Sequence, residues 1–159
     1  MHRMLRRAIA LGLLTTLTAI GVASATPGAG ATPTNLSRGT LDAGDKINTA
    51  NLKLKIRTDI DVLTQTITIT PGGHTGWHSH PGPVFVTIAS GAMTFYDGDD
   101  PTCTPIVYNT GDSFIDESGG HVHIARNLGS VDLVLYATYL LPVGTGARID
   151  AADPGNCPA

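Results

Sequence analysis

Short runs of alternating apolar and polar residues, separated by turns rich in glycine and proline, most constrain the fold of this chain. Leucine and isoleucine alternate with lysine and arginine over residues 52–57, and residues 63–70 place a threonine at every second position. A period of two is that of a strand with one buried face. Further strands are expected at 76–80, 84–90, 92–97, 105–108, 112–115, 121–127 and 131–141. The pattern predicts an all-β sandwich or barrel.

The first 25 residues have the features of a secretory signal. Three arginines precede an uncharged stretch, residues 8–25, which ends in Ala-Ser-Ala. A basic start, an apolar centre and a small-x-small end are typical of a cleaved signal peptide. The stretch is short against the roughly 20 apolar residues of a spanning helix, so no stable membrane anchor is expected. We therefore expect residues 1–25 to be a signal peptide and the protein to be secreted or otherwise extracytoplasmic.

The charge balance narrows the class of partner. The chain holds 10 Lys+Arg and 13 Asp+Glu, and the predicted signal takes three arginines and no acid. Residues 26–159 then carry seven basic against 13 acidic residues, a formal charge of −6. An acidic protein without basic clusters is not expected to bind nucleic acid. A small-molecule ligand or substrate is the expected partner.

Residues 26–159 suffice for one domain. Residues 26–45 begin with a Gly-, Pro- and Thr-rich run without apolar periodicity and are expected to be a flexible leader, followed by a domain at 46–145 and a tail at 146–159. In an oxidising compartment, Cys103 and Cys157 are expected to form a disulfide that ties the tail to an earlier loop. Two free thiols, one of them a metal ligand, are the alternative.

Five of the six histidines fall in the second half of the chain or just before it, at His74, His78, His80, His121 and His123. His78 and His80 are two residues apart, so on a strand both imidazoles point to the same face. A metal ion is the commonest reason to bring neutral imidazoles together.

Two segments resemble the two motifs of the cupin superfamily. Gly72 to Gly91 follows the first motif, in which five residues separate the first glycine from His78-Ser79-His80. Gly111 to Asn127 is similar to the second, which ends in a histidine, three residues and an asparagine. The resemblance implies a double-stranded β-helix, or jelly-roll barrel, that binds one divalent metal through His78, His80 and His123.

The chain departs from the cupin motifs in two places. Val84 stands where the family usually has a metal-binding glutamate, and residues 117–118 stand where it usually has proline. Because valine cannot coordinate a metal, the site has three protein ligands or takes another, for which His74, His121 and, more distantly, Glu117 are candidates. Val84 and Val86 are expected to line an apolar cavity beside the metal.

The resemblance leaves the chemistry open, because one fold supports many activities. Three imidazoles suit Fe, Zn, Mn, Cu or Ni, and the sequence does not choose among them. The first hypothesis is a mononuclear metal-dependent oxidoreductase of dioxygenase type that acts on a small organic molecule. The alternative is a non-catalytic module that binds a small ligand or a metal. By analogy with cupins that pair through sheet edges, a homodimer is expected.

Overall fold

The computed structural model describes residues 25–157, and every regular element in that part is a β-strand. The predicted signal peptide lies outside the described residues, apart from Ala25, and stays a prediction. No helix among residues 25–157 is long and apolar enough to cross a membrane. In chain order the strands are β1 (Ala29–Leu41), β2 (Lys46–Asn48), β3 (Lys53–Lys55), β4 (Ile60–His74), β5 (His78–Ser79), β6 (Val84–Ser90), β7 (Ala92–Asp97), β8 (Ile106–Asn109), β9 (Ser113–Asp116), β10 (His123–Arg126), β11 (Leu133–Pro142) and β12 (Ile149–Asp150).

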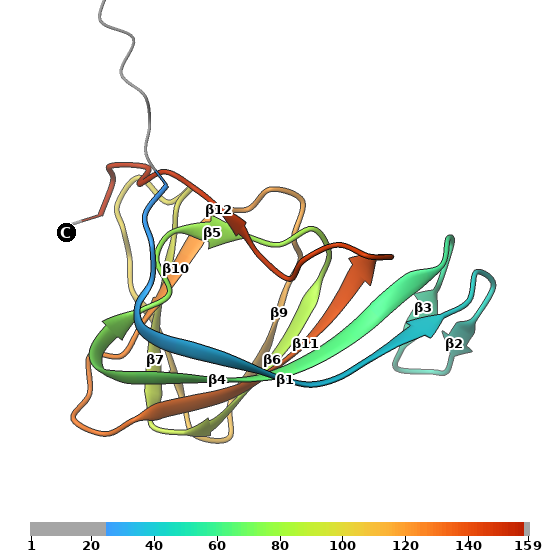
Figure 1. The fold of residues 1–159 in the computed structure, drawn as a ribbon, viewed down its shortest axis with the longest axis horizontal. Helices are drawn as coiled ribbons and strands as arrows, with labels where there is room; N and C mark the ends of the chain where they lie inside the picture. The colour runs from blue at the N-terminus through green and yellow to red at the C-terminus, as the bar shows by residue number, and fades with distance from the viewer. Residues whose placement is uncertain (1–24, 158–159) are drawn as a thin grey trace, which may run out of the picture.

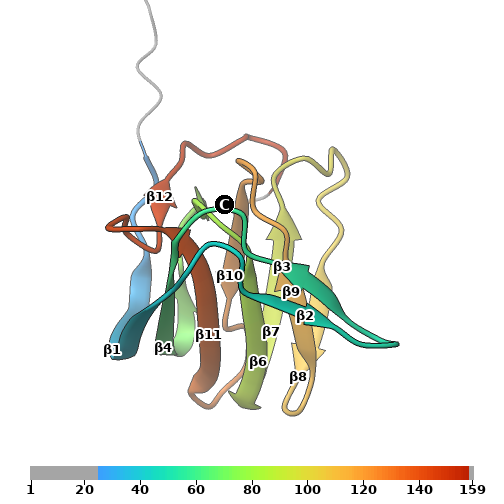
Figure 2. The same ribbon diagram turned by 90° about the vertical axis from the view of Figure 1, so that its right-hand side faces the viewer.

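Two antiparallel layers form a nearly closed barrel (Figures 1 and 2). One layer runs β1-β4-β11-β6-β9 and the other β8-β7-β10-β5-β12. They are joined where Arg126 of β10 pairs with His74 of β4. The hairpin of β2 and β3 projects from one side of the barrel (Figure 1). The predicted all-β, jelly-roll fold is confirmed.

The core lies between the two layers and follows the predicted alternation. In β6, Val84, Val86 and Ile88 are buried while Phe85 and Thr87 are exposed. Strand β11 alternates in the same way, and its buried residues are Leu133, Leu135, Ala137, Tyr139 and Leu141. Replacing one of these buried leucines by alanine should lower the free energy of unfolding by about 2–5 kcal/mol, because the cavity left behind collapses only partly.

The expected flexible leader at residues 26–45 is wrong, because most of it forms β1. This strand pairs with β4 from Leu41 opposite Ile60 to Ala29 opposite His74. It is an edge strand whose side chains are nearly all exposed. Main-chain hydrogen bonds hold it in place, so no apolar alternation marks it in the sequence.

The segments beyond the expected domain limits meet at one end of the barrel. Ala25 forms a bridge with Ala152, and the N–H of Thr26 donates to the carbonyl of Ala151 at 3.0 Å. Strand β12, inside the expected tail, pairs with β5 and so joins the sheet. The predicted disulfide between Cys103 and Cys157 is present, with Cα atoms 5.2 Å apart.

Candidate metal centre

Three buried histidines face one another inside this end of the barrel. His78 of β5 is the register partner of His123 of β10, and His80 directly follows β5. The ring centroids lie 4.8 Å apart for His78 and His80, 4.4 Å for His78 and His123, and 5.1 Å for His80 and His123. One ring nitrogen from each residue lies within 4.8 Å of the others. The fold thus gathers the three histidines singled out in the sequence.

Main-chain carbonyl groups orient two of these imidazoles. Nδ1 of His78 lies 2.9 Å from the carbonyl oxygen of Gly76, and Nδ1 of His80 lies 2.6 Å from that of Ala147. A carbonyl only accepts, so each Nδ1 carries the proton and each Nε2 keeps its lone pair. That tautomer presents Nε2 to a metal.

Burial keeps the cluster uncharged at neutral pH. It lowers the pKa of His78 to about 2, and the charge that His123 takes up in acid and the charge of Arg148 act in the same direction. Burial also lowers the pKa of His80, and it lowers the pKa of His123 to about 4 although the Asp116 carboxylate opposes it. The imidazoles therefore need lose no proton before Nε2 binds a cation.

A cavity opens beside the histidines. It has a volume of about 460 Å³, and its wall includes His78, His80, Ile67, Tyr139 and Arg148. A smaller space of about 50 Å³ continues inward and is lined by all three histidines of the cluster together with Asp116, Val84 and Val86. Both valines thus lie on the inner wall beside the cluster, and a small molecule can approach it from the larger cavity.

Arg148 is the only lysine or arginine on the wall of the larger cavity, within the described residues. Its Nε donates to the Asp150 carboxylate, which helps to hold the guanidinium in place. Its positive charge also contributes to the lowered pKa values of His78 and His80. Arg148 thus brings a positive charge to the cavity wall, and Asp150 offsets part of it.

The positions considered for a fourth ligand lie outside the three-histidine cluster. His74 ends β4, and its Nδ1 accepts the N–H of Gly76 at 3.1 Å. Glu117 is exposed. His121 precedes β10 and turns its Nε2 toward Oδ1 of Asp97, 2.9 Å away. Burial lowers the pKa of His121, but the hydrogen bond and charge of Asp97 outweigh it, so the net shift is upward.

Asp116, like Arg148, is a site residue that the sequence pattern did not single out. It ends β9, it is buried, and its Oδ2 lies 3.2 Å from Nδ1 of His123 and 3.9 Å from Nε2 of His80. Oδ1 accepts the N–H of Ser118 at 2.9 Å. One signal was available, because Asp116 stands two residues after the inward-facing Phe114 and so shares its strand face.

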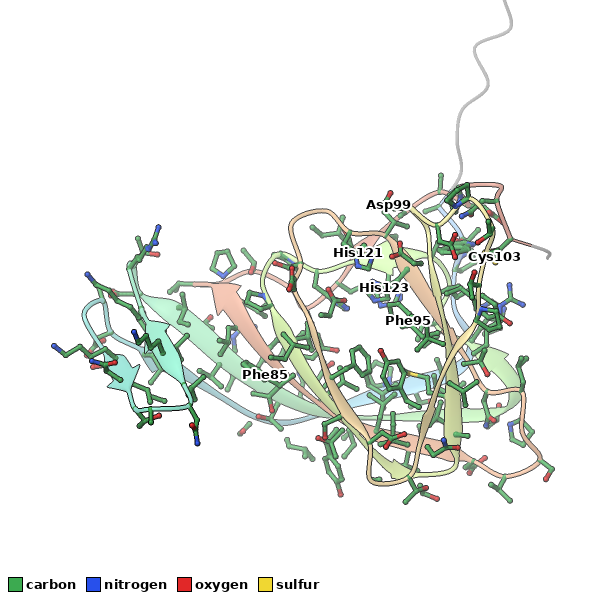
Figure 3. The ribbon with its side chains drawn as sticks, turned by 180° about the vertical axis from the view of Figure 1, so that it is seen from behind. Phe85, Phe95, Asp99, Cys103, His121 and His123 are labelled. Atoms are coloured by element: carbon green, nitrogen blue, oxygen red, sulfur yellow. A yellow bond between two sulfur atoms is a disulfide. The ribbon has the colours of Figure 1, made fainter. Side chains whose placement is uncertain are left out.

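An aromatic ring supports the cluster from the neighbouring strand of the same layer. Phe95 of β7 stacks on His123, with ring centroids 5.0 Å apart and planes inclined by 24°. His121 lies 6.4 Å from the same ring. Figure 3 shows His121, His123 and Phe95 together, with Asp99 and Cys103 in the nearby loops. The stacking restricts the ring of His123 to one orientation.

Similarity to known proteins lies in the barrel strands. A family model described as Cupin domain matches residues 65–139. A cupin-like protein from Thermotoga maritima is 21% identical, and the match covers 58% of this chain and 65% of that chain with a TM-score of 0.49. A protein with a double-stranded β-helix domain from Klebsiella pneumoniae is 23% identical, and the match covers 57% of this chain and 74% of that chain with a TM-score of 0.47. A Cupin 2 conserved barrel domain protein from Salinispora arenicola is 17% identical, and the match covers 52% of this chain and 64% of that chain with a TM-score of 0.44. The chain thus spans less than two thirds of the Thermotoga and Salinispora chains. No curated protein matches the sequence.

Proposed function

We propose that this chain, which belongs to the cupin superfamily, binds one divalent transition metal through His78, His80 and His123. With that metal it would act outside the cytoplasm as an oxidoreductase of dioxygenase type on a small organic molecule. The supporting observation is a buried cluster of three neutral imidazoles beside a cavity of about 460 Å³. The disulfide between Cys103 and Cys157 supports an oxidising compartment.

The donor set fits a transition metal. Three imidazoles suit Fe, Zn, Mn, Cu or Ni, whereas magnesium and calcium prefer oxygen ligands. Oδ2 of Asp116 is buried and has no hydrogen-bond partner among the described residues. A buried carboxylate oxygen without a partner is costly, and a cation in the neighbouring cluster would offset that cost.

Each part of the site has a distinct task in this proposal. A metal held by three protein ligands would supply open positions for an organic ligand and dioxygen together. Val84 and Val86 present only hydrocarbon to the inner space, which keeps water away from the cluster. Tyr139 lies 5.3 Å from the ring of His80, and burial raises its pKa to about 12, so its hydroxyl remains a hydrogen-bond donor.

The charge of the site favours a small organic anion as ligand. The three imidazoles are neutral, so Asp116 offsets only one of the two charges of a divalent metal. Arg148 adds a positive charge at the cavity wall. An organic carboxylate would satisfy both, with its oxygens toward the metal and the guanidinium.

A non-catalytic module that binds a metal or a small ligand is the second candidate. Val84 favours it, because the position that usually carries a coordinating glutamate in cupins is here apolar and buried. Such a module needs a binding site but no open coordination positions. The two candidates therefore differ in whether the metal exchanges water and reacts with dioxygen.

The test is the metal content of the secreted protein, purified by its own route without chelators or added histidines. His80→Ala would be measured beside it, with His74→Ala as the matched control. We expect near-stoichiometric metal in the unaltered protein and in His74→Ala, and none in His80→Ala. Iron would be followed by dioxygen uptake with small organic acids. No metal in any protein, even after reconstitution, would contradict the ligand assignment.

A further inference from the structure

We infer that Asp116 is a positioning residue of the metal site: its carboxylate accepts the Nδ1–H of His123 and replaces, from the neighbouring strand, the carboxylate that position 84 lacks. This inference rests on the metal site proposed above. It assigns a role to a residue outside the histidine set, and it keeps one carboxylate in a site whose position 84 is a valine.

Register places the two positions side by side. Val84 of β6 and Asp116 of β9 are direct partners in an antiparallel pair. Directly opposed residues have Cβ atoms about 5 Å apart and point to the same face. Both side chains are buried, and both line the inner space beside the three histidines. A carboxylate on β9 therefore enters nearly the region that one on β6 would reach.

The contact between Asp116 and His123 joins two buried atoms. Nδ1 of His123 and Oδ2 of Asp116 are 3.2 Å apart, yet they are not aligned for a hydrogen bond. Within the described residues neither of these buried atoms has another hydrogen-bond partner. When Nε2 of His123 binds a metal, the proton must stay on Nδ1, and Oδ2 is the acceptor within reach. Such contacts often tighten only when a site is filled.

The three imidazoles then differ in the group that accepts the proton on Nδ1, the nitrogen that does not face the metal. Main-chain carbonyls of Gly76 and Ala147 hold His78 and His80, whereas a carboxylate holds His123. A carboxylate makes the imidazole a stronger donor to a metal than a carbonyl does, and it brings a negative charge to a neutral ligand set. Loss of such a partner typically weakens metal binding about 10- to 100-fold.

The carboxylate is itself held in place, which gives a clean variant. Oδ1 of Asp116 accepts the N–H of Ser118 at 2.9 Å. In Asp116→Asn the amide oxygen can keep that bond at the same size, while the other atom loses both its charge and its capacity to accept. Asp97→Asn is the matched control, because Asp97 pairs with His121 outside the three-histidine cluster.

The experiment is a competition titration of zinc into the metal-free proteins, with cobalt(II) absorption as a second measurement. We expect Asp116→Asn to bind zinc about 10- to 100-fold more weakly than the unaltered protein and Asp97→Asn to bind as the unaltered protein does. Asp116→Glu, which keeps the charge, should bind more tightly than Asp116→Asn. The cobalt spectrum should keep its coordination number in Asp116→Asn, because the same nitrogens bind.

Two results would overturn the inference. One is unchanged zinc affinity in Asp116→Asn, and the other is a cobalt spectrum that shows a lost oxygen ligand, which would make Asp116 a direct ligand. An equal loss in Asp116→Asn and Asp116→Glu with equally lowered melting temperatures would indicate packing and would also overturn it. Absence of zinc binding in the unaltered protein would instead refute the proposed function.

Discussion

Val84 and Asp116 oppose each other across β6 and β9, one an apolar and the other an acidic side chain, and both are buried beside the histidine cluster. The pair gives the inner space a hydrocarbon wall on one strand and a single carboxylate on the next. The acidic group therefore lies against the outer nitrogen of His123. The same carboxylate lies 3.9 Å from Nε2 of His80, so it also reaches toward the space between the three neutral imidazoles.

Val84→Glu tests how the site tolerates a second carboxylate. In the metal-free protein the new side chain would face Asp116, and two buried carboxylates cannot both ionise cheaply. We expect a lower melting temperature without metal than in the unaltered protein, but a larger rise on adding zinc. Thermal unfolding with a chelator and with zinc measures both quantities. A zinc-induced rise equal to that of the unaltered protein would show that position 84 does not reach the metal.

The stability of the metal-free protein should fall on mild acidification. Unfolded histidines take up protons as the pH drops below about 6.5, whereas burial lowers the pKa of folded His78 to about 2 and of folded His123 to about 4. Below pH 6.5 the unfolded chain therefore binds more protons than the folded chain. The stability from these histidines is full above pH 6.5 and is lost as the pH falls toward the folded pKa values. The free energy of unfolding falls by about 1.4 kcal/mol for each pH unit and each such histidine. His121, whose pKa is raised, acts in the opposite sense.

Urea unfolding of chelator-treated protein at about pH 7 and about pH 5 measures this loss. Carboxylates change little in that window, so the histidines dominate it. His78→Gln should show a shallower dependence on pH. Equal stability at the two pH values would contradict burial of neutral imidazoles.

Asn127→Ala should destabilise the fold without removing the metal site. Nδ2 of Asn127 donates to the carbonyls of Ile69 at 2.7 Å and Val131 at 2.8 Å, and Oδ1 accepts the N–H of Gly129 at 3.0 Å. Alanine leaves these groups unpaired, which should lower the free energy of unfolding by about 2–4 kcal/mol. Chemical denaturation and metal analysis together check this prediction. Lost metal at unchanged stability would place Asn127 in the site instead.

The disulfide should contribute to stability through the unfolded chain. The double variant Cys103→Ser with Cys157→Ser removes a bond between residues that are 54 positions apart in the sequence. We expect the free energy of unfolding to fall by about 2–4 kcal/mol, with the histidine cluster retained. Reduction of the unaltered protein should reproduce the effect in denaturation curves, and it should leave the double variant unchanged. A double variant as stable as the oxidised protein would show that the bond is dispensable.

The alternation of apolar and polar residues was enough to predict the strands that have one buried face. The alternation in β6 and β11 appears in the sequence because side chains of a strand point to opposite faces in turn. The same rule placed His78 and His80 on one face. Strand β1 escaped prediction because it is an edge strand with almost no buried side chain. Main-chain pairing to β4 holds it, and main-chain pairing leaves no trace in residue type.

The sequence by itself determined the all-β fold and the shared face of His78 and His80, and with the cupin motifs it indicated His123 as their partner; it favoured the disulfide without excluding free thiols. Only the tertiary structure decided that Asp116 touches His123, that His121 turns to Asp97, and that Arg148 stands at the cavity wall. Each of these placements involves residues from different strands or loops. Their positions depend on inter-strand register and on how the ends of the chain close the barrel, which the period of any one strand does not encode.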